Sequence, residues 1–594
     1  MSDDAHAAGP DETHPSTPTP PRAAPGDEAS TEAPGHPAPA LAAARGYQQP
    51  AFAAAPGYRT AAYPPPPPGY GPGPRPGYGR PPTTALGPVA TLPPRPPGPV
   101  TSAVAEFWRA GHGLSASALA VCAGVGVLGG VLLVGHRPGL GAALVGLGVW
   151  LAAVPALVRR RAIDDLLTAG LSVALLSMVA VRDAGWIVAV CAAAAAVLAA
   201  VALTGARSAG AVLGSVVGWC AGLLRALPWV GRSLRAGARR GRFAALARTG
   251  AVTAVLLVVF GVLFSSADLV FASYVPDVHV DLLPAQVAAG IGVALAAATF
   301  AHLAAAPPGW SDLRAGHGRP AALAEWAVPV VALDAMVLAF VLVQVGGLLG
   351  GHLHILEAAD LSYAEYARQG FGQLVAATAL TLLVVGVAAR HAPRTTPRER
   401  LVVRLALGVL CVGTLGVVAS AVRRMDLYVE AFGLTRLRLF VVVVEVTLGV
   451  VLLLVLAAGV RWRGAWLPRA IAHVAGVAVL GLALANPDAV ILRHNTTVLA
   501  TVLAGAAEAS EASEASDASD VADLDYLRGL SADAVPSAAA LEEPLRSCVL
   551  ATMEVVAPEG FADWNLGRMR AADVLAGEPV DPTGVDCAPP STGG

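Results

Sequence analysis

The sequence contains no lysine, so all 40 of its basic residues are arginines. Charged residues make up only 14% of its 594 residues, against about 25% in soluble globular proteins. Hydrophobic residues make up 55%, and the mean hydropathy is +0.61. The net charge of −2 indicates no general attraction to nucleic acid. The scarcity of charge excludes an ordinary cytosolic enzyme and favours a membrane protein.

The sequence also lacks the short motifs of common enzyme classes. It has no GxSxG, Walker A, dinucleotide-binding or kinase signature in a suitable context, and it has no CxxC pair. We therefore predict no metal and no cofactor. Without a catalytic signature, the sequence favours a non-enzymatic protein.

Residues 1–105 form a tail rich in proline, glycine and tyrosine. The first 100 residues hold 27 of the 47 prolines, including an unbroken run from Pro64 to Pro68. Such a segment buries too little apolar surface to offset its ordering entropy, so we predict a disordered tail with polyproline II character. It has no signal-peptide pattern. The tail is either a docking site for a protein partner or a solvated tether.

A long apolar region follows the tail. A bilayer core of about 30 Å needs roughly 20 apolar residues in a helix. The sequence predicts an all-α transmembrane bundle, with a four-helix segment at 106–203 and a seven-helix core at 249–496. The eleven predicted spans are 114–135, 139–158, 166–181, 185–203, 249–267, 286–306, 325–349, 371–389, 402–422, 439–460 and 470–485.

Arginine placement predicts the orientation of these spans in the bilayer. Loops on the side of residues 204–248 carry 21 arginines, and loops on the other side carry 8. The positive-inside rule then predicts a cytoplasmic N-terminus and an extracytoplasmic C-terminus. The segment 204–248 itself is basic and amphipathic. We predict that it lies on the inner leaflet and binds anionic lipid; the alternative is a regulatory target site.

The chain changes character again after the last span. Residues 507–523 repeat Glu-Ala-Ser and Asp-Ala-Ser, which is typical of a flexible acidic linker. Residues 524–594 predict a small helical domain on the outer side. Its two cysteines, Cys548 and Cys587, are candidates for a disulfide, because an extracytoplasmic location is oxidising. The other four cysteines lie in apolar segments, where they pack as small hydrophobes.

Two carboxylates fall inside predicted spans. Asp334 lies about nine residues into the seventh span, and Glu445 about seven residues into the tenth. Because a charge at the bilayer centre is costly, such groups face the bundle interior and often serve as proton or ion relays. The alternative is a protonated carboxyl satisfied by a neighbouring helix.

Four longer polar phrases lie between or after the spans. They are Tyr363 to Phe371 leading into Gln373-Leu374, Leu427 to Arg438, Asn486 to Asn495, and Asp523 to Asp533. In this order they resemble a multi-pass bacterial membrane family that is catalogued as a domain of unknown function, the 4153/4173 group. The resemblance covers roughly residues 250–575. It implies an integral protein of the bacterial cell membrane, and the family brings no activity with it.

On the predicted topology all four phrases are external, so their side chains are candidates for one outward polar surface. Arginine beside tyrosine and glutamate suits anionic or sugar-like ligands. The alternative is a set of interhelical hydrogen bonds and a dock for the C-terminal domain. The candidates are Tyr363, Tyr366, Arg368, Gln373, Tyr428, Glu430, Arg436, Arg438, Asn486, Asp488, Arg493 and Asn495.

These features leave three hypotheses open. The first, which we favour, is a non-enzymatic envelope sensor, scaffold or transporter-like component. The second is a membrane-embedded enzyme that acts on a lipid-linked or envelope substrate at the outer face. The third is a proton-coupled transporter that uses Asp334 and Glu445.

Overall fold

The computed structural model is all-helical in the part of the chain that it describes, as predicted. Contacts divide the chain into two units, Met1–Pro93 and Pro94–Gly594, and every described residue belongs to the second. The predicted tail, residues 1–105, and the acidic linker, residues 507–523, lie outside the described residues. The described residues are 107–108, 115–239, 241–268, 271, 280–310, 322–350, 371–462, 464–497, 524–543, 545–551, 553 and 555–577.

A first group of helices packs around the pair α2 and α9. A Cβ on Gly126 would lie 2.7 Å from the Gly290 carbonyl oxygen, and a Cβ on Gly130 would lie 2.5 Å from that of Gln286. Only glycine permits this close approach of the two backbones. The group consists of α2 (Ala116–Leu133), α3 (Leu140–Arg160), α4 (Ile163–Ser177) with the 3-10 turn η1 (Met178–Ala180), α5 (Gly185–Thr204), and α9 (Leu283–Ala305) after the 3-10 turn η2 (Val280–Leu282).

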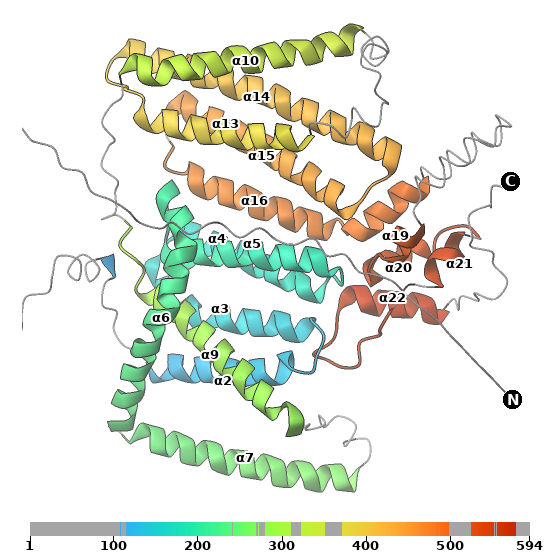
Figure 1. The fold of residues 1–594 in the computed structure, drawn as a ribbon. Coiled ribbons are helices and arrows are strands. Elements are labelled where there is room, and N and C mark those ends of the chain that lie inside the picture. Colours follow the sequence, from blue (N-terminus) through green and yellow to red (C-terminus); the bar gives the residue numbers. More distant parts are fainter. Residues whose placement is uncertain are drawn as a thin grey trace, which may run out of the picture. The chain divides into compact units, whose positions relative to one another are not determined.

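A second group lies side by side in Figure 1 and consists of α10 (Leu323–Gly350), α13 (Phe371–His391), α14 (Pro397–Phe432) and α15 (Arg436–Arg461). The start of α14 shows how the sequence sets a boundary. The Glu399 N–H donates to Thr396 Oγ1 at 3.2 Å, and the Glu399 carboxylate accepts the Thr396 N–H at 3.0 Å. This capping box satisfies two backbone donors that the helix start would otherwise leave free.

Helix α16 (Leu467–Leu484) lies between the two groups. It contacts α4 and α5 of the first group and α15 of the second. Residues 487–497 continue as a further helix. Ile491 and Leu492 of that helix are fully buried, so this segment is an integral part of the packed core.

The chain ends in a small helical cap, which we define as the described residues between Leu524 and Gly577. Its apolar side chains share one core with the helix at 487–497 and with the end of α14. The cap therefore packs directly on the helix ends beside it (Figure 1). Its elements are α19 (Leu524–Arg528), η3 (Ala532–Ala534), α20 (Val535–Ala538), α21 (Leu545–Leu550) and α22 (Leu566–Gly577).

Eleven helices in the described part are long and apolar enough to cross a membrane. This number equals the predicted number, but the set differs in two members. Helix α2 is shorter than a full span, with its apolar stretch at Ser117–Leu133, while α6 (Ala209–Arg239) qualifies. Every predicted span nevertheless coincides with a helix, including α7 (Arg242–Ala267).

Contacts show that α6 does not run from one end of the helix bundle to the opposite end. The Arg160 guanidinium donates to the Leu303 carbonyl at 2.5 Å, and Trp310 Nε1 donates to the Thr204 carbonyl at 3.1 Å. The C-terminal ends of α3, α5 and α9 therefore lie at the same end of the bundle. The chain between Thr204 and Leu303 must then run the length of the bundle an even number of times. Helices α7 and α9 account for two such passes, so α6 does not make a third.

Helix α6 runs across these ends instead of parallel to the other helices (Figure 1). A Cβ on Gly222 would touch the Leu303 side chain, and the Trp229 ring lies 4.8 Å from the His302 ring. Both partners belong to the last turn of α9. We refer to this side as the far end, and to the opposite side, where the cap packs, as the cap end.

Candidate functional site

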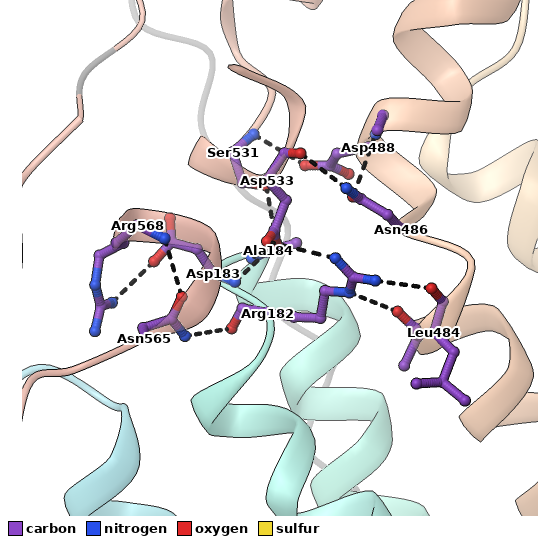
Figure 2. A network of polar contacts seen from close by, with 12 residues as sticks. Arg182, Asp183, Ala184, Leu484, Asn486, Asp488, Ser531, Asp533, Asn565 and Arg568 are labelled. Carbon is purple, nitrogen blue, oxygen red and sulfur yellow. Dashed lines mark hydrogen bonds and ion pairs between the residues drawn. The ribbon is translucent and has the colours of Figure 1, made fainter. Parts of the chain in front are cut away.

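The junction between the cap and the helix ends holds a network of polar contacts that joins several elements (Figure 2). Asp533, in the 3-10 turn η3, has its carboxylate at the start of α5. Its Oδ2 accepts the backbone N–H groups of Asp183 at 2.7 Å and Ala184 at 2.9 Å. Because helix starts have unpaired N–H groups and a positive dipole end, a buried carboxylate is stabilised there. The side chain thus fastens the cap to α5.

Arg182, in the turn between η1 and α5, connects that turn to the end of α16. Its guanidinium donates to the carbonyls of Ala483 and Leu484, both at 2.7 Å, which are the last residues of α16. It also lies 3.9 Å from the Asp533 carboxylate. Arginine at a helix C-terminus satisfies carbonyls that have no partner within the helix.

Asp488 joins three parts of the chain at one carboxylate. It is 0% exposed and accepts two hydrogen bonds from Arg436, at 3.0 and 2.7 Å. It also accepts the Ser531 N–H at 2.9 Å and Trp186 Nε1–H at 3.1 Å. Arg436 begins α15, Trp186 lies in α5 and Ser531 belongs to the cap, so both helix groups and the cap meet here.

Asn565 and Arg568 complete the junction from α22. Asn565 Nδ2 donates to the carbonyls of Val179 at 3.0 Å and Arg182 at 2.9 Å, while its Oδ1 accepts the Arg568 N–H. The Arg568 guanidinium donates to the Asp183 carboxylate at 2.9 Å. The cap thereby holds the α4–α5 turn through both backbone and side chains.

The loop before α22 also closes the start of α3. The Leu140 N–H donates to the Trp564 carbonyl at 2.8 Å, and the Gly141 N–H donates to the Ala562 carbonyl at 3.0 Å. These donors belong to the first turn of α3, where no partner exists within the helix. The cap therefore contacts α3, α5 and α15 at the same end.

The two junction carboxylates have opposite pKa shifts. Burial would raise the pKa of Asp488, but the hydrogen bonds from Arg436, Ser531 and Trp186 outweigh it and lower the pKa below 3.8. Burial raises the pKa of Asp533, and the hydrogen bonds from Ala184 and Asp183 offset that only in part. Asp488 is therefore held as an anion, whereas Asp533 is the more readily protonated.

The structure brings together some of the predicted polar residues and separates others. Arg436, Asn486 and Asp488 lie in the junction, with Asn486 donating to the Asp533 carbonyl at 2.8 Å. Asp488 and Asn495 are buried, and hence not part of an exposed surface.

Five other predicted residues, together with Asn495, lie apart from the junction. Asn495 pairs in both directions with the Leu434 backbone, and Arg438 stacks 4.2 Å over the Tyr428 ring. Gln373, Glu430 and Arg493 are exposed. Tyr363, Tyr366 and Arg368 lie outside the described residues.

Sequence reasoning did not single out four of the junction residues. They are Arg182, Trp186, Asn565 and Arg568. In the sequence Arg182 is one of the eight arginines in the predicted outer loops, with nothing else to set it apart. A usable signal exists for Asn565, because asparagine one residue before a helix is a common N-cap.

The predicted disulfide is only half within the described residues. Cys548 is buried and disulfide-bonded, and Cys587 lies outside the described part. Cys122, Cys191, Cys220 and Cys411 are free. The pairing of Cys548 with Cys587 therefore stays a prediction.

The two carboxylates within spans differ from the other buried acids. Asp165, Asp488 and Asp533 each lie within 4.0 Å of an arginine nitrogen. Asp334 and Glu445 are also buried, at 7% and 0% exposure. Across the described ranges neither has an ion pair, and Asp334 Oδ1 and Glu445 Oε2 have no hydrogen-bond partner.

Glu445 has one hydroxyl group as a polar neighbour in the second group. Thr378 of α13 donates to Glu445 at a long 3.5 Å, and it is itself fully buried. Leaving a charge unpaired in a dry interior is costly, so each carboxylate must carry a proton or hold a cation. A relay or cation site at these residues stays a prediction, and a carboxyl that remains protonated is the alternative.

No group of three or more metal-binding side chains occurs among the residues that the structure describes. A shallow pocket of about 470 Å³ lies at the cap end. It is lined by Leu140, Pro558, Glu559, Gly560, Phe561 and Trp564. With a single ionisable side chain, it has no pair of groups for acid–base chemistry.

Comparison with known proteins agrees with the resemblance seen in the sequence. The family model described as "Domain of unknown function (DUF4153)" matches residues 170–541, which is more than half of the chain. The match begins in α4, earlier than the expected start near 250, and ends within the cap. No curated protein and no solved structure matches the chain.

Proposed function

This chain belongs to the family described as a domain of unknown function, DUF4153, and we propose that it is a non-enzymatic scaffold of the bacterial cell envelope. The helix groups cross the cell membrane and hold the cap on its outer face. The observation that carries the proposal is that Asp488 bonds at once to α5, α15 and the cap. An open ligand-binding surface would instead leave such groups exposed to solvent.

Arginine distribution supports an outward cap. The far end gathers six described arginines of three neighbouring loops, where Arg469 donates to the Ala206 carbonyl and to Asp165. They are Arg159, Arg160, Arg161, Arg207, Arg461 and Arg469. Such loops favour the cytoplasmic side. The N-terminal tail, predicted on the same side, is either a docking site for a protein partner or a solvated tether.

Single cysteines test this orientation, with Phe561→Cys in the cap and Arg398→Cys at the far end, both exposed. A membrane-impermeant maleimide should label only the first in intact cells. The reverse pattern would overturn the orientation.

A deletion strain tests the scaffold itself. It is complemented with the full chain, with a chain ending before residue 507, or with the double variant Asp334→Asn/Glu445→Gln. Growth under osmotic and detergent stress is the measurement. A scaffold needs the cap but not the carboxylates, so only the truncated chain should fail to complement.

A locked cap separates a scaffold from a sensor that must open. A Cβ on Gly141 would lie 3.2 Å from the Ala562 Cβ, close to the Cβ–Cβ distance of about 3.5–4.5 Å in disulfides. The pair Gly141→Cys/Ala562→Cys should therefore cross-link with a small shift. Full complementation by the cross-linked protein supports a static scaffold, and loss that is reversed by reduction indicates a sensor.

A proton-coupled transporter is the second candidate, favoured by the unpaired oxygens of Asp334 and Glu445. Proteoliposomes with an internal pH dye test it, because a relay would dissipate an imposed pH gradient. Asp334→Asn and Glu445→Gln should then abolish the flux. Glu399→Gln, at the start of α14, is the control and should leave the flux unchanged.

A further inference from the structure

A shallow pocket of about 470 Å³ opens where the cap meets the start of α3. Its walls are Leu140, the first residue of α3, and residues of the cap loop at 558–564. The loop is fixed there, because the first two N–H groups of α3 donate to the carbonyls of Ala562 and Trp564. The pocket therefore has a definite height along α3.

The length of α3 places this pocket at the boundary of the membrane core. Helix α3 is a candidate span of 21 residues, about 31 Å at 1.5 Å per residue, and a bilayer core is about 30 Å thick. Its last two residues, Arg159 and Arg160, belong at headgroup level on the opposite face of the membrane. Leu140, at the other end of α3, then lies where acyl chains meet the hydrated headgroups.

An apolar stripe runs along α3 from the pocket. Successive helix residues are rotated by about 100°, so Leu140, Leu147 and Leu151 share one side of α3. Val154 and Val158 continue this side. The four residues that follow Leu140 in the stripe are 40–59% exposed, and most of the buried residues of α3 lie on the opposite side. A lipid whose acyl chain covers this stripe has its headgroup at the pocket.

The pocket combines two aromatic rings with one carboxylate. Phe561 is the one large apolar side chain that is exposed among the described residues of the cap, at 64%, and Trp564 also lines the pocket. Glu559 is exposed, and across the described ranges it has no ion pair. Aromatic faces attract ammonium groups, and a carboxylate in the same pocket adds a counter-charge and a hydrogen-bond acceptor. An anionic headgroup would instead meet a like charge.

We propose that this pocket binds the headgroup of a phospholipid with a primary ammonium group, whose acyl chain lies along the apolar stripe of α3. Glu559 accepts a hydrogen bond from the ammonium group, and the rings of Phe561 and Trp564 pack against it. The lipid then bridges the cap and α3 at the membrane surface. The site requires α3 to span the bilayer, but it depends neither on the scaffold function nor on which face of the membrane holds the cap.

Native mass spectrometry of the full chain in a non-ionic detergent tests the proposal. The probes are phosphatidylethanolamine, phosphatidylglycerol and glycerophosphoethanolamine, each titrated separately. We expect phosphatidylethanolamine to bind at least about fivefold more tightly than either of the others, because the second probe lacks the ammonium group and the third lacks acyl chains. Equal binding of phosphatidylglycerol would overturn the ammonium assignment, and equal binding of glycerophosphoethanolamine would overturn the lipid assignment.

Variants locate the site, because they leave lipid bound elsewhere on the spans unaffected. Glu559→Gln removes the charge and should weaken phosphatidylethanolamine binding about fivefold, as expected for an exposed ion pair. Phe561→Ala should weaken it by a similar factor, whereas Phe561→Tyr keeps the ring and should change it less than about twofold. Glu542→Gln is the matched control, since it removes an exposed carboxylate of the cap that does not line the pocket, and it should have no effect.

Hydrogen exchange at Leu140 and Gly141 shows separately whether the cap loop stays docked. Their N–H groups donate to the loop, so exchange would speed up if a variant released it. Glu559 and Phe561 are both exposed, so we expect unchanged exchange in their variants. Glu559→Gln keeps the shape of the side chain and decides the case if Phe561→Ala releases the loop. Unchanged phosphatidylethanolamine binding in Glu559→Gln would refute the site, and so would an equal loss in Glu542→Gln.

Discussion

Replacing Asp488 with asparagine should loosen the cap more than any other conservative change at the junction. The carboxylate is 0% exposed and accepts four hydrogen bonds, two of them from Arg436. In asparagine one of the two oxygens becomes an NH₂ group, which then faces N–H donors. The guanidinium of Arg436 also loses its counter-charge.

The magnitude follows from burial. Breaking a fully buried ion pair costs about 3–5 kcal/mol. The Arg436 side chain is 33% exposed and regains some hydration once it is freed, so we expect about 2–3 kcal/mol. At 1.4 kcal/mol per factor of ten, the equilibrium for cap release rises by about 30- to 150-fold.

Hydrogen exchange of the purified protein measures this release. The amides of Asp183 and Ala184 donate to Asp533, so they are protected only while the cap is docked. Their exchange rate should rise by the same factor if release precedes exchange.

Asp426→Asn is the matched control, because Asp426 pairs with Arg423 on the surface, where it is 59% exposed. Such exposed pairs contribute little. An increase of less than twofold in Asp488→Asn, or an equal increase in both variants, would refute the role of Asp488.

Three further predictions concern pH, a glycine and the far end. Cap docking, measured by hydrogen exchange at residues 183–184, should persist from pH 7 to about pH 4 and weaken only below 3.8. The pKa of Asp488 is lowered in the folded protein, so its contribution to docking is lost only when acid protonates the carboxylate. Asp533, whose pKa is raised, is protonated at a higher pH, which removes the cost of burying its charge. Gly567→Ala should raise the same exchange rate tenfold or more, since a Cβ there would overlap the Asp533 carboxylate, while Gly560→Ala has open space and should have no effect. Asp165→Asn should destabilise the protein by about 3–5 kcal/mol in thermal unfolding, because Asp165 and Arg469 are both buried; the adjacent exposed Asp164→Asn should not, and equal effects would contradict the pairing.

The spans were predictable because their cause is local. A run of about 20 apolar residues has few alternatives to a membrane helix, so each predicted span coincides with a helix in the structure. The arginines of α6 are also visible in the sequence alone, and they distinguish this basic segment from the predicted spans on either side. Residue counting alone would have added α6 to the spans, as its length and hydropathy permit.

The junction was not predictable because its partners are far apart in the sequence. Arg182 and Asp533 are separated by about 350 residues, and nothing near either one identifies the other. Asp488 and Arg436 were candidates because each belongs to a polar phrase between or after the spans. What the sequence left open was whether such residues face solvent or pair with each other, since this depends on how the helix ends meet.

The location of the ion pairs bears on the choice between scaffold and transporter. Helix α16 is held to the first group at both ends, by Arg469 with Asp165 at the far end and by Arg182 at the cap end. The second group is tied to this unit at the cap end through Arg436 and Asp488. Movement of one group against the other at this end would strain or break that pair, at a cost of about 2–3 kcal/mol. A transporter would need a coupling ion or substrate to supply this energy in each cycle, whereas a scaffold gains rigidity from the same contacts. The carboxylates of Asp334 and Glu445 lie in the second group alone, so a proton could bind there without any movement between the groups.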